Sequence, residues 1–98
     1  MSIKFDEAEK LLNTHRRHLS RLGTRRLAIF GSIARNEGTK KSDIDILVDF
    51  DAKKGFFVFA DLKFYLEDIL HCNVDLVSTR ALHPALKKRI LSEAKQIF

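Results

Sequence analysis

The segment FGSIARNEGTKKSDIDILVDF, residues 30–50, constrains the fold of this chain more than any other segment. It ends in alternating acidic and apolar residues, in which Asp43 and Asp45 are separated by one isoleucine. Successive side chains of a β-strand point to opposite faces, so a strand here places both carboxylates on one face and Ile44, Ile46 and Val48 on the other. The segment therefore predicts a strand with one apolar face and one acidic face.

The rest of the sequence predicts helices and strands in alternation. Apolar spacing predicts helices over residues 7–22, 55–70 and 83–98 and a short helix over 32–36. β-type runs predict strands over 25–30, 42–50 and 73–78. Asp6 with Glu9 resembles a capping box, Gly23 suits a helix C-terminus, and Pro84 suits a first helical position. The order α-β-α-β-α-β-α predicts one two-layer α+β domain over residues 1–98.

Length and composition exclude several classes of protein. A chain of 98 residues with 45% hydrophobic and 32% charged residues predicts one globular domain and argues against disorder. The single cysteine, Cys72, excludes an intramolecular disulfide and suits a small, partly buried apolar position. The longest apolar run, Phe56 to Ala60, is far too short to cross a membrane. We therefore expect a cytoplasmic protein.

The positive charge is distributed over the whole chain rather than concentrated in one tail. The net charge is +5, and the segment HRRHLSRLGTRR, residues 15–26, holds five arginines and two histidines. Such a run is more often a solvated helix face than a phosphate-binding patch, and the two interpretations stay open. Because no RNA-recognition or zinc-finger pattern accompanies it, nucleic acid is disfavoured as a partner.

The acid pair and the Gly-Ser turn before it suggest one binding site for Mg²⁺ and a polyphosphate. Two partly desolvated carboxylates repel each other unless a cation offsets their charge, and Mg²⁺ prefers carboxylates together with the phosphates of a substrate. Gly31 lets the backbone approach a phosphate, Ser32 adds a hydroxyl donor, and Arg35 can reach the same polyphosphate. Asp49 lies on the same strand face, but further along, and is taken as peripheral.

Taken singly, each of these features has a structural explanation. The Gly-Ser pair fits a simple strand-to-helix turn, and the acid pair fits a charged sheet edge. The combined pattern G-S-x10-D-x-D, however, arises by chance in fewer than roughly one chain in a thousand of this length. The combination therefore favours a nucleotide site.

These residues resemble the motif of the DNA polymerase beta-like nucleotidyltransferases. The pattern is carried by Gly31, Ser32, ten intervening residues, Asp43 and Asp45. The runs SDIDILVDF and VDLV, with the L-x-P-x-L pattern that begins at Leu82, are similar to the minimal nucleotidyltransferases, and the resemblance extends over residues 25–98. It implies the nucleotidyltransferase fold with a small mixed sheet of three strands. Relatives have glycine where this chain has Asn36, which tolerates a positive φ better than other residues.

The resemblance also implies roles for individual residues. Gly31 and Ser32 would hold the β- and γ-phosphates of the nucleotide, with ATP as the expected substrate. Asp43, Asp45 and a third carboxylate, which matches Asp75, would bind two Mg²⁺ ions. Asp75 lies between apolar residues of the third strand, so its alternative explanation is a surface charge at a strand end.

In the resembled family the protein is an antitoxin that transfers AMP to a tyrosine of a HEPN-domain toxin, and we expect the same here. The phenylalanines of the helix over 55–70 predict a surface that docks on this toxin or on a second copy of the chain. Tyr65, the only tyrosine, is expected to pack in the core. Two alternatives stay open: a non-catalytic antitoxin that neutralises its partner by binding, and a nucleic-acid-binding module that uses the arginine-rich first helix.

Overall fold

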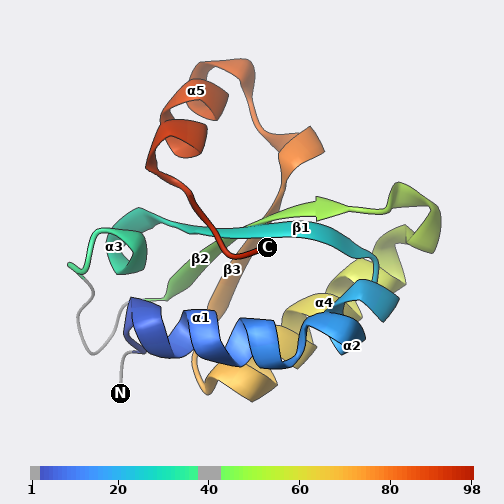
Figure 1. The fold of residues 1–98 in the computed structure, drawn as a ribbon. Helices are drawn as coiled ribbons and strands as arrows, with labels where there is room; N and C mark the ends of the chain where they lie inside the picture. Colours follow the sequence, from blue (N-terminus) through green and yellow to red (C-terminus); the bar gives the residue numbers. More distant parts are fainter. Residues whose placement is uncertain (1–2, 38–42) are drawn as a thin grey trace.

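A computed structural model describes residues 3–37 and 43–98. Its centre is a four-stranded sheet in the order β3-β2-β1-β4 (Figure 1). The strands are β1 (Thr24–Phe30), β2 (Ile44–Phe50), β3 (Val74–Ser78) and β4 (Lys95–Gln96). β1 pairs antiparallel with β2 and with β4, while β2 and β3 run parallel, so the sheet is mixed as expected.

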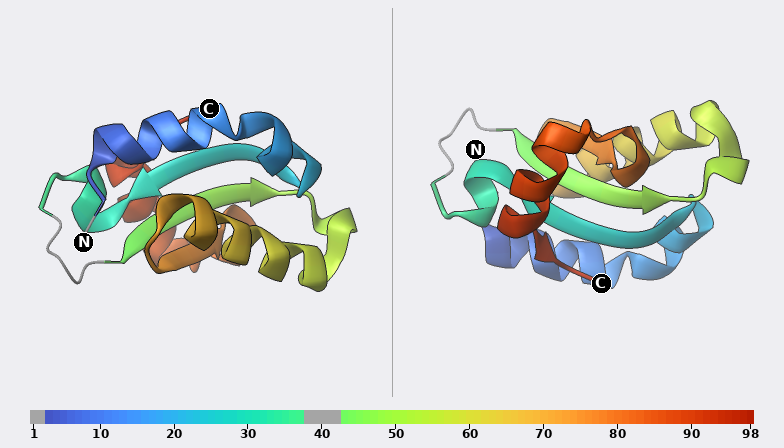
Figure 2. Two further views of the ribbon diagram at one scale, coloured as in Figure 1. Left: turned by 90° about the horizontal axis from the view of Figure 1, so that it is seen from below. Right: turned by 90° about the horizontal axis from the view of Figure 1, so that it is seen from above.

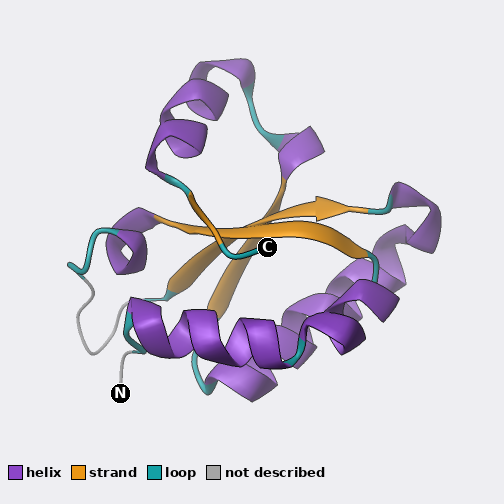
Figure 3. Ribbon diagram, viewed as in Figure 1, coloured by secondary structure: helices purple, strands orange, loops and turns teal. Residues whose placement is uncertain are grey.

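The helices lie in different layers on the two sides of this sheet (Figure 3). α1 (Phe5–Thr14), α2 (Arg16–Arg21) and α4 (Gly55–Leu70) cover one face, and α5 (Pro84–Glu93) lies over the opposite face (Figures 1 and 2). The short α3 (Gly31–Ala34) follows β1 directly, and single 3-10 turns span Ala52–Lys54 and Thr79–Ala81. None of these described helices is long and apolar enough to cross a membrane.

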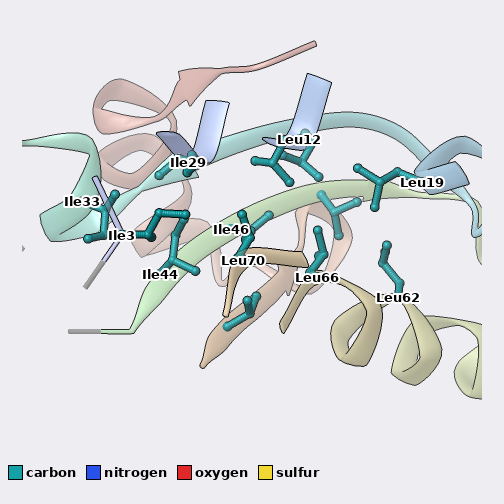
Figure 4. Packing of buried hydrophobic residues seen from close by; sticks show 14 of the residues in the cluster. Ile3, Leu12, Leu19, Ile29, Ile33, Ile44, Ile46, Leu62, Leu66 and Leu70 are labelled. Atoms are coloured by element: carbon teal, nitrogen blue, oxygen red, sulfur yellow. The ribbon is translucent and has the colours of Figure 1, made fainter. Parts of the chain in front are cut away.

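The hydrophobic core lies between the sheet and the helices α1, α2 and α4. Ile44, Ile46 and Val48 of β2 are fully buried there, which confirms the apolar strand face that the alternation predicts. Their partners from the helices include Leu12, Leu19, Leu62, Leu66 and Leu70 (Figure 4). Burial of each such side chain contributes about 1.5–3 kcal/mol relative to exposure, so this layer supplies most of the packing stability.

The C-terminal segment differs from the prediction. The expected helix over 83–98 ends at Glu93, and β4 follows as a fourth strand where three strands were predicted. No residue of α5 is buried, so the helical stripe gains little from continuing. The edge of β1 instead satisfies backbone groups of this segment, because the Ile97 N–H donates a hydrogen bond to the Leu27 carbonyl over 2.8 Å.

The N-terminal helix also differs from the single helix expected over 7–22. It is divided into α1 and α2 at His15, and it begins at Phe5 without a side-chain cap, so the predicted capping box is wrong. His15 is partly buried, and its Nδ1 lies 3.0 Å from the hydroxyl of Tyr65 on α4. The break thus leaves His15 at the edge of the core, where it contacts Tyr65, and Tyr65 packs in the structure as expected.

Candidate functional site

The acidic residues meet where β2 and β3 run side by side. The parallel register aligns Asp45 of β2 with Asp75 of β3, and Asp43 immediately precedes β2. Because Ile44 and Ile46 point into the core on the other side, Asp45 faces the sheet surface that α5 overlies. Asp45 is half-buried, whereas Asp43 and Asp75 are exposed. The fold therefore gathers all three predicted acids at one end of one sheet face.

Their proximity has an electrostatic consequence. The pKa of Asp45 is raised from its ordinary value of 3.8 to about 6, first by burial and then by the negative charges of Asp75 and Asp43. The guanidinium of Arg35 acts in the opposite direction and lowers the pKa of Asp45. Asp45 thus experiences net repulsion that a further cation could offset.

Gly31 lies directly against these acids. Its φ is +71°, and a Cβ atom built on it would overlap the Oδ2 atom of Asp45. A larger residue would be strained by the backbone angle and would also displace the carboxylate. Ser32, the next residue, is half-buried in α3. The structure therefore brings the Gly31–Ser32 turn and Asp45 together, although ten residues separate Ser32 from Asp43 in the sequence.

The turn after α3 closes through the backbone. Asn36 has a φ of 57°, which confirms that this asparagine accepts a positive φ, as expected. The Glu37 N–H donates a hydrogen bond to the Ser32 carbonyl over 2.8 Å. Most of the loop predicted between α3 and β2 lies outside the described residues.

Arg35 takes part in ion pairs that the sequence did not reveal. Its Nε lies 3.0 Å from a carboxylate oxygen of Glu37, and its Nη1 lies 3.2 Å from one of Glu93 on α5. Arg35 is exposed, so these pairs are weak and exchangeable. No sequence signal could identify Glu93, which is 58 residues away. Arg35 therefore links the Gly-Ser turn to α5, and its contact with a nucleotide stays a prediction.

The carboxylates do not form a closed metal cage. Among residues 3–37 and 43–98, no group of three or more histidine, cysteine, aspartate or glutamate side chains is arranged to hold a metal ion. Mg²⁺ is commonly held by only one or two carboxylates together with substrate phosphates. The donors around Asp45 are carboxylate oxygens, and their negative charge is only partly offset by Arg35. Such a site fits a Mg²⁺ ion that is also bound by the phosphates of a nucleotide.

Three phenylalanines of α4 remain outside the core. Phe56, Phe57 and Phe64 are 76%, 84% and 64% exposed, whereas Phe59 packs edge-to-face on Phe50 with ring centroids 5.1 Å apart. These three side chains therefore form apolar surface on α4 that the sheet does not cover.

Known proteins share the sequence and the fold. Residues 10–98 match the family of polymerase beta nucleotidyltransferases. The protein adenylyltransferase MntA of Thermococcus cleftensis is 38% identical over 92 residues, which cover 93% of this chain and 93% of that protein. A solved structure of a candidate minimal nucleotidyltransferase superposes with a TM-score of 0.75 at 37% identity, covering 89% of this chain and 93% of the other. A crystal structure of a toxin-antitoxin with AMP-PNP gives a TM-score of 0.73 at 25% identity, covering 92% and 72%.

Proposed function

This chain belongs to the polymerase beta nucleotidyltransferase family, and from that membership we propose that it transfers AMP from ATP to a hydroxyl group of a partner protein. The observation that carries the proposal is the meeting of Asp43, Asp45 and Asp75 beside the Gly31–Ser32 turn. A nucleotidyl transfer needs a place for a triphosphate next to carboxylates that hold a metal ion. The name of the relative from Thermococcus cleftensis, a protein adenylyltransferase, supports a protein acceptor.

Gly31 and Ser32 bind the β- and γ-phosphates in this proposal. Because Gly31 has no side chain, its backbone approaches the phosphates beside Asp45, and the Ser32 hydroxyl donates a hydrogen bond to them. Arg35 adds positive charge once it exchanges Glu37 or Glu93 for a phosphate oxygen. Since both ion pairs are exposed, this exchange costs little.

In this proposal Asp43, Asp45 and Asp75 would hold Mg²⁺ together with the phosphates of the nucleotide, and we expect two ions. Bound Mg²⁺ would neutralise charge on the phosphates and on the leaving pyrophosphate. The raised pKa of Asp45 supports this assignment, because a carboxylate under net repulsion gains from a cation nearby. We assign to Asp75, which is exposed on the neighbouring strand, the role of accepting the proton of the attacking hydroxyl.

The transfer forms one bond and breaks another. The acceptor oxygen forms a bond to the α-phosphorus, and the bond from the α-phosphorus to the oxygen that bridges to the β-phosphate breaks. AMP stays on the acceptor and pyrophosphate leaves. The hydroxyl proton passes to the Asp75 carboxylate and from there to water.

The partner we propose is a HEPN-domain toxin, and the acceptor is one of its tyrosines, so this chain acts as its antitoxin in the cytoplasm. A toxin-antitoxin assembly with AMP-PNP among its structural neighbours supports this choice. The exposed phenylalanines of α4 offer a surface for such a partner, since contiguous apolar patches often mark protein interfaces.

The test is transfer of label from ATP, labelled at the α-phosphate, to a HEPN-domain protein from the same organism. Wild type with Mg²⁺ is expected to label the partner, and the variant Asp43→Asn/Asp45→Asn to lose at least about 10³-fold in rate. Asp68→Asn is the matched control, because Asp68 is an exposed acid on α4. An unlabelled partner with wild type, or full labelling by the double variant, contradicts the proposal. Protection of cells by the double variant would instead support neutralisation by binding.

A further inference from the structure

A cavity of about 320 Å³ lies on the acidic side of the sheet. Its floor includes Ala28 of β1 and Leu47 of β2, and its other walls include Thr79, Leu91 of α5 and Ala94, which directly follows α5. Ligand pockets span about 300–1,000 Å³, so this volume suits one side chain or a small ring system. The proposed function assigns no role to this cavity.

The cavity has a fixed position relative to the acids. Asp45 and Leu47 point to the same face of β2, two residues or about 7 Å apart along the strand. The antiparallel register pairs Phe30 with Asp45 and Ala28 with Leu47. Gly31 follows Phe30 on the other side of Asp45. Along the sheet, the order is therefore the Gly-Ser turn, the acids and then the cavity.

This order matters for the direction of attack. In phosphoryl and nucleotidyl transfer the attacking and leaving oxygens are roughly in line through the phosphorus. In the proposed function the pyrophosphate lies at Gly31 and Ser32, and the α-phosphorus lies at the aspartates. The attacking hydroxyl must then arrive from the side opposite the Gly-Ser turn, where the cavity lies. We propose that this cavity is the acceptor pocket and that it receives an aromatic hydroxyl side chain of the partner.

The walls of the cavity suit a phenol ring. Leu47, Ala28, Ala94 and Leu91 supply apolar surface, and Leu91 is 49% exposed although it is a large hydrophobic residue. A tyrosine carries its hydroxyl at the end of a flat apolar ring, so the ring can lie among these side chains while the oxygen reaches the acids. A serine or threonine hydroxyl is too close to its own backbone to span about 7 Å of strand.

The polar wall gives Asp49 a role that its sequence position did not suggest. Asp49 shares the strand face of Asp45 and Leu47 and lines the cavity at the end away from the acids. Thr79 lies at the end of β3 and adds a hydroxyl. These groups can accept and donate hydrogen bonds to the backbone of the acceptor segment. They therefore position the acceptor and take no part in the bond changes.

The inference rests on the proposed function and has its own test. Leu91→Trp fills the cavity at a half-exposed position, and Leu86→Trp places the same ring on an exposed position of α5 that does not line the cavity. We expect Leu91→Trp to raise the KM for the partner or lower kcat/KM at least about tenfold. The Kd for AMP-PNP with Mg²⁺ should stay within about twofold of wild type. Leu86→Trp should match wild type in both measurements.

A double-mutant cycle separates the pocket from a general docking effect. The acceptor tyrosine, located by mass spectrometry on the labelled partner, is replaced by alanine, and complex affinity is measured with wild type and with Leu91→Trp. The tyrosine replacement should weaken binding to wild type and leave binding to Leu91→Trp unchanged. Equal weakening in both backgrounds overturns the inference.

Three other outcomes also overturn it, and they identify what failed. A Leu91→Trp variant that loses AMP-PNP binding shows that the cavity holds the nucleotide instead. A variant that transfers AMP as well as wild type shows that the cavity is unused, while the proposed function survives. If wild type binds AMP-PNP but labels no partner, both the proposed function and the acceptor pocket fail.

Discussion

The two faces of the central sheet differ in how completely they are packed. On β2, Ile44, Ile46 and Val48 are fully buried against α1 and α4, whereas Asp45 and Asp49 on the opposite face are only half-buried. No residue of α5, which overlies that second face, is buried. One face thus supplies stability, and the other holds a repulsive acid cluster and a cavity. This separation lets the chemistry change without removing the core.

The largest effect is expected on the packed face. Leu66→Ala removes a fully buried side chain of α4 and should lower the free energy of unfolding by about 2–5 kcal/mol. Leu86→Ala, at an exposed position of α5, should change it by less than about 0.5 kcal/mol. Urea unfolding of both variants measures the difference. Equal losses would contradict the division between the two faces.

An intermediate effect is expected at the Gly-Ser turn. Gly31 and Gly55 both have positive φ values, but a Cβ on Gly31 meets Asp45 and a Cβ on Gly55 meets nothing within 4 Å. Gly55→Ala therefore carries only the backbone strain, about 1 kcal/mol. Gly31→Ala adds the collision, so we expect a loss of about 2–3 kcal/mol in stability and at least tenfold weaker binding of AMP-PNP. Unfolding and calorimetry on the pair check this, and identical behaviour would remove the need for glycine beside the acids.

The smallest effect concerns the cost of the acid cluster in the absence of metal. The folded pKa of Asp45, about 6, is above its ordinary value of 3.8, so the folded state favours the protonated form. The contribution of Asp45 to stability is therefore present at low pH and is lost as the pH rises from about 4 through about 6. Asp45→Asn removes the charge that destabilises the folded state at high pH. It should therefore stabilise the metal-free chain near pH 8 by about 1 kcal/mol, a value reduced for solvent screening, and should have little effect near pH 4.

Thermal unfolding in a chelator at both pH values measures this difference. Asp68→Asn, an exposed acid on α4, should show no comparable pH-dependent gain. A stabilisation by Asp45→Asn that is equal at both pH values would contradict the electrostatic explanation.

Much of the fold was predictable because it depends on local patterns. The alternation over β2 predicted which of its side chains are buried. The apolar spacing over residues 55–70 predicted α4 with its observed bounds, Gly55–Leu70. The same local patterns failed at the C-terminus, where the edge of β1 competes with helix formation. A periodicity within one segment contains no information about an unpaired strand edge elsewhere.

The candidate site was also predictable where its residues lie close together in the sequence, and it was not predictable where they come from distant segments. Gly31, Ser32, Asp43 and Asp45 form a pattern within fifteen residues, and Asp75 was found by its family match and its apolar neighbours. The ion pair between Arg35 and Glu93 was not predicted, and neither was the cavity below α5. Both depend on how α5 returns across the sheet, which no single segment specifies.

Local residue patterns were enough to predict the two-faced character of β2 and the membership of a nucleotidyltransferase family. These depend on side-chain alternation and on residue types at short spacing, which the chain carries wherever it folds. Three features became visible only in the folded chain: Asp75 lies beside Asp45, β4 covers the edge of β1, and a cavity lies next to the acids along the sheet. Those features arise from strand register and from contacts between segments far apart in the chain, and such contacts form only when the whole core is packed.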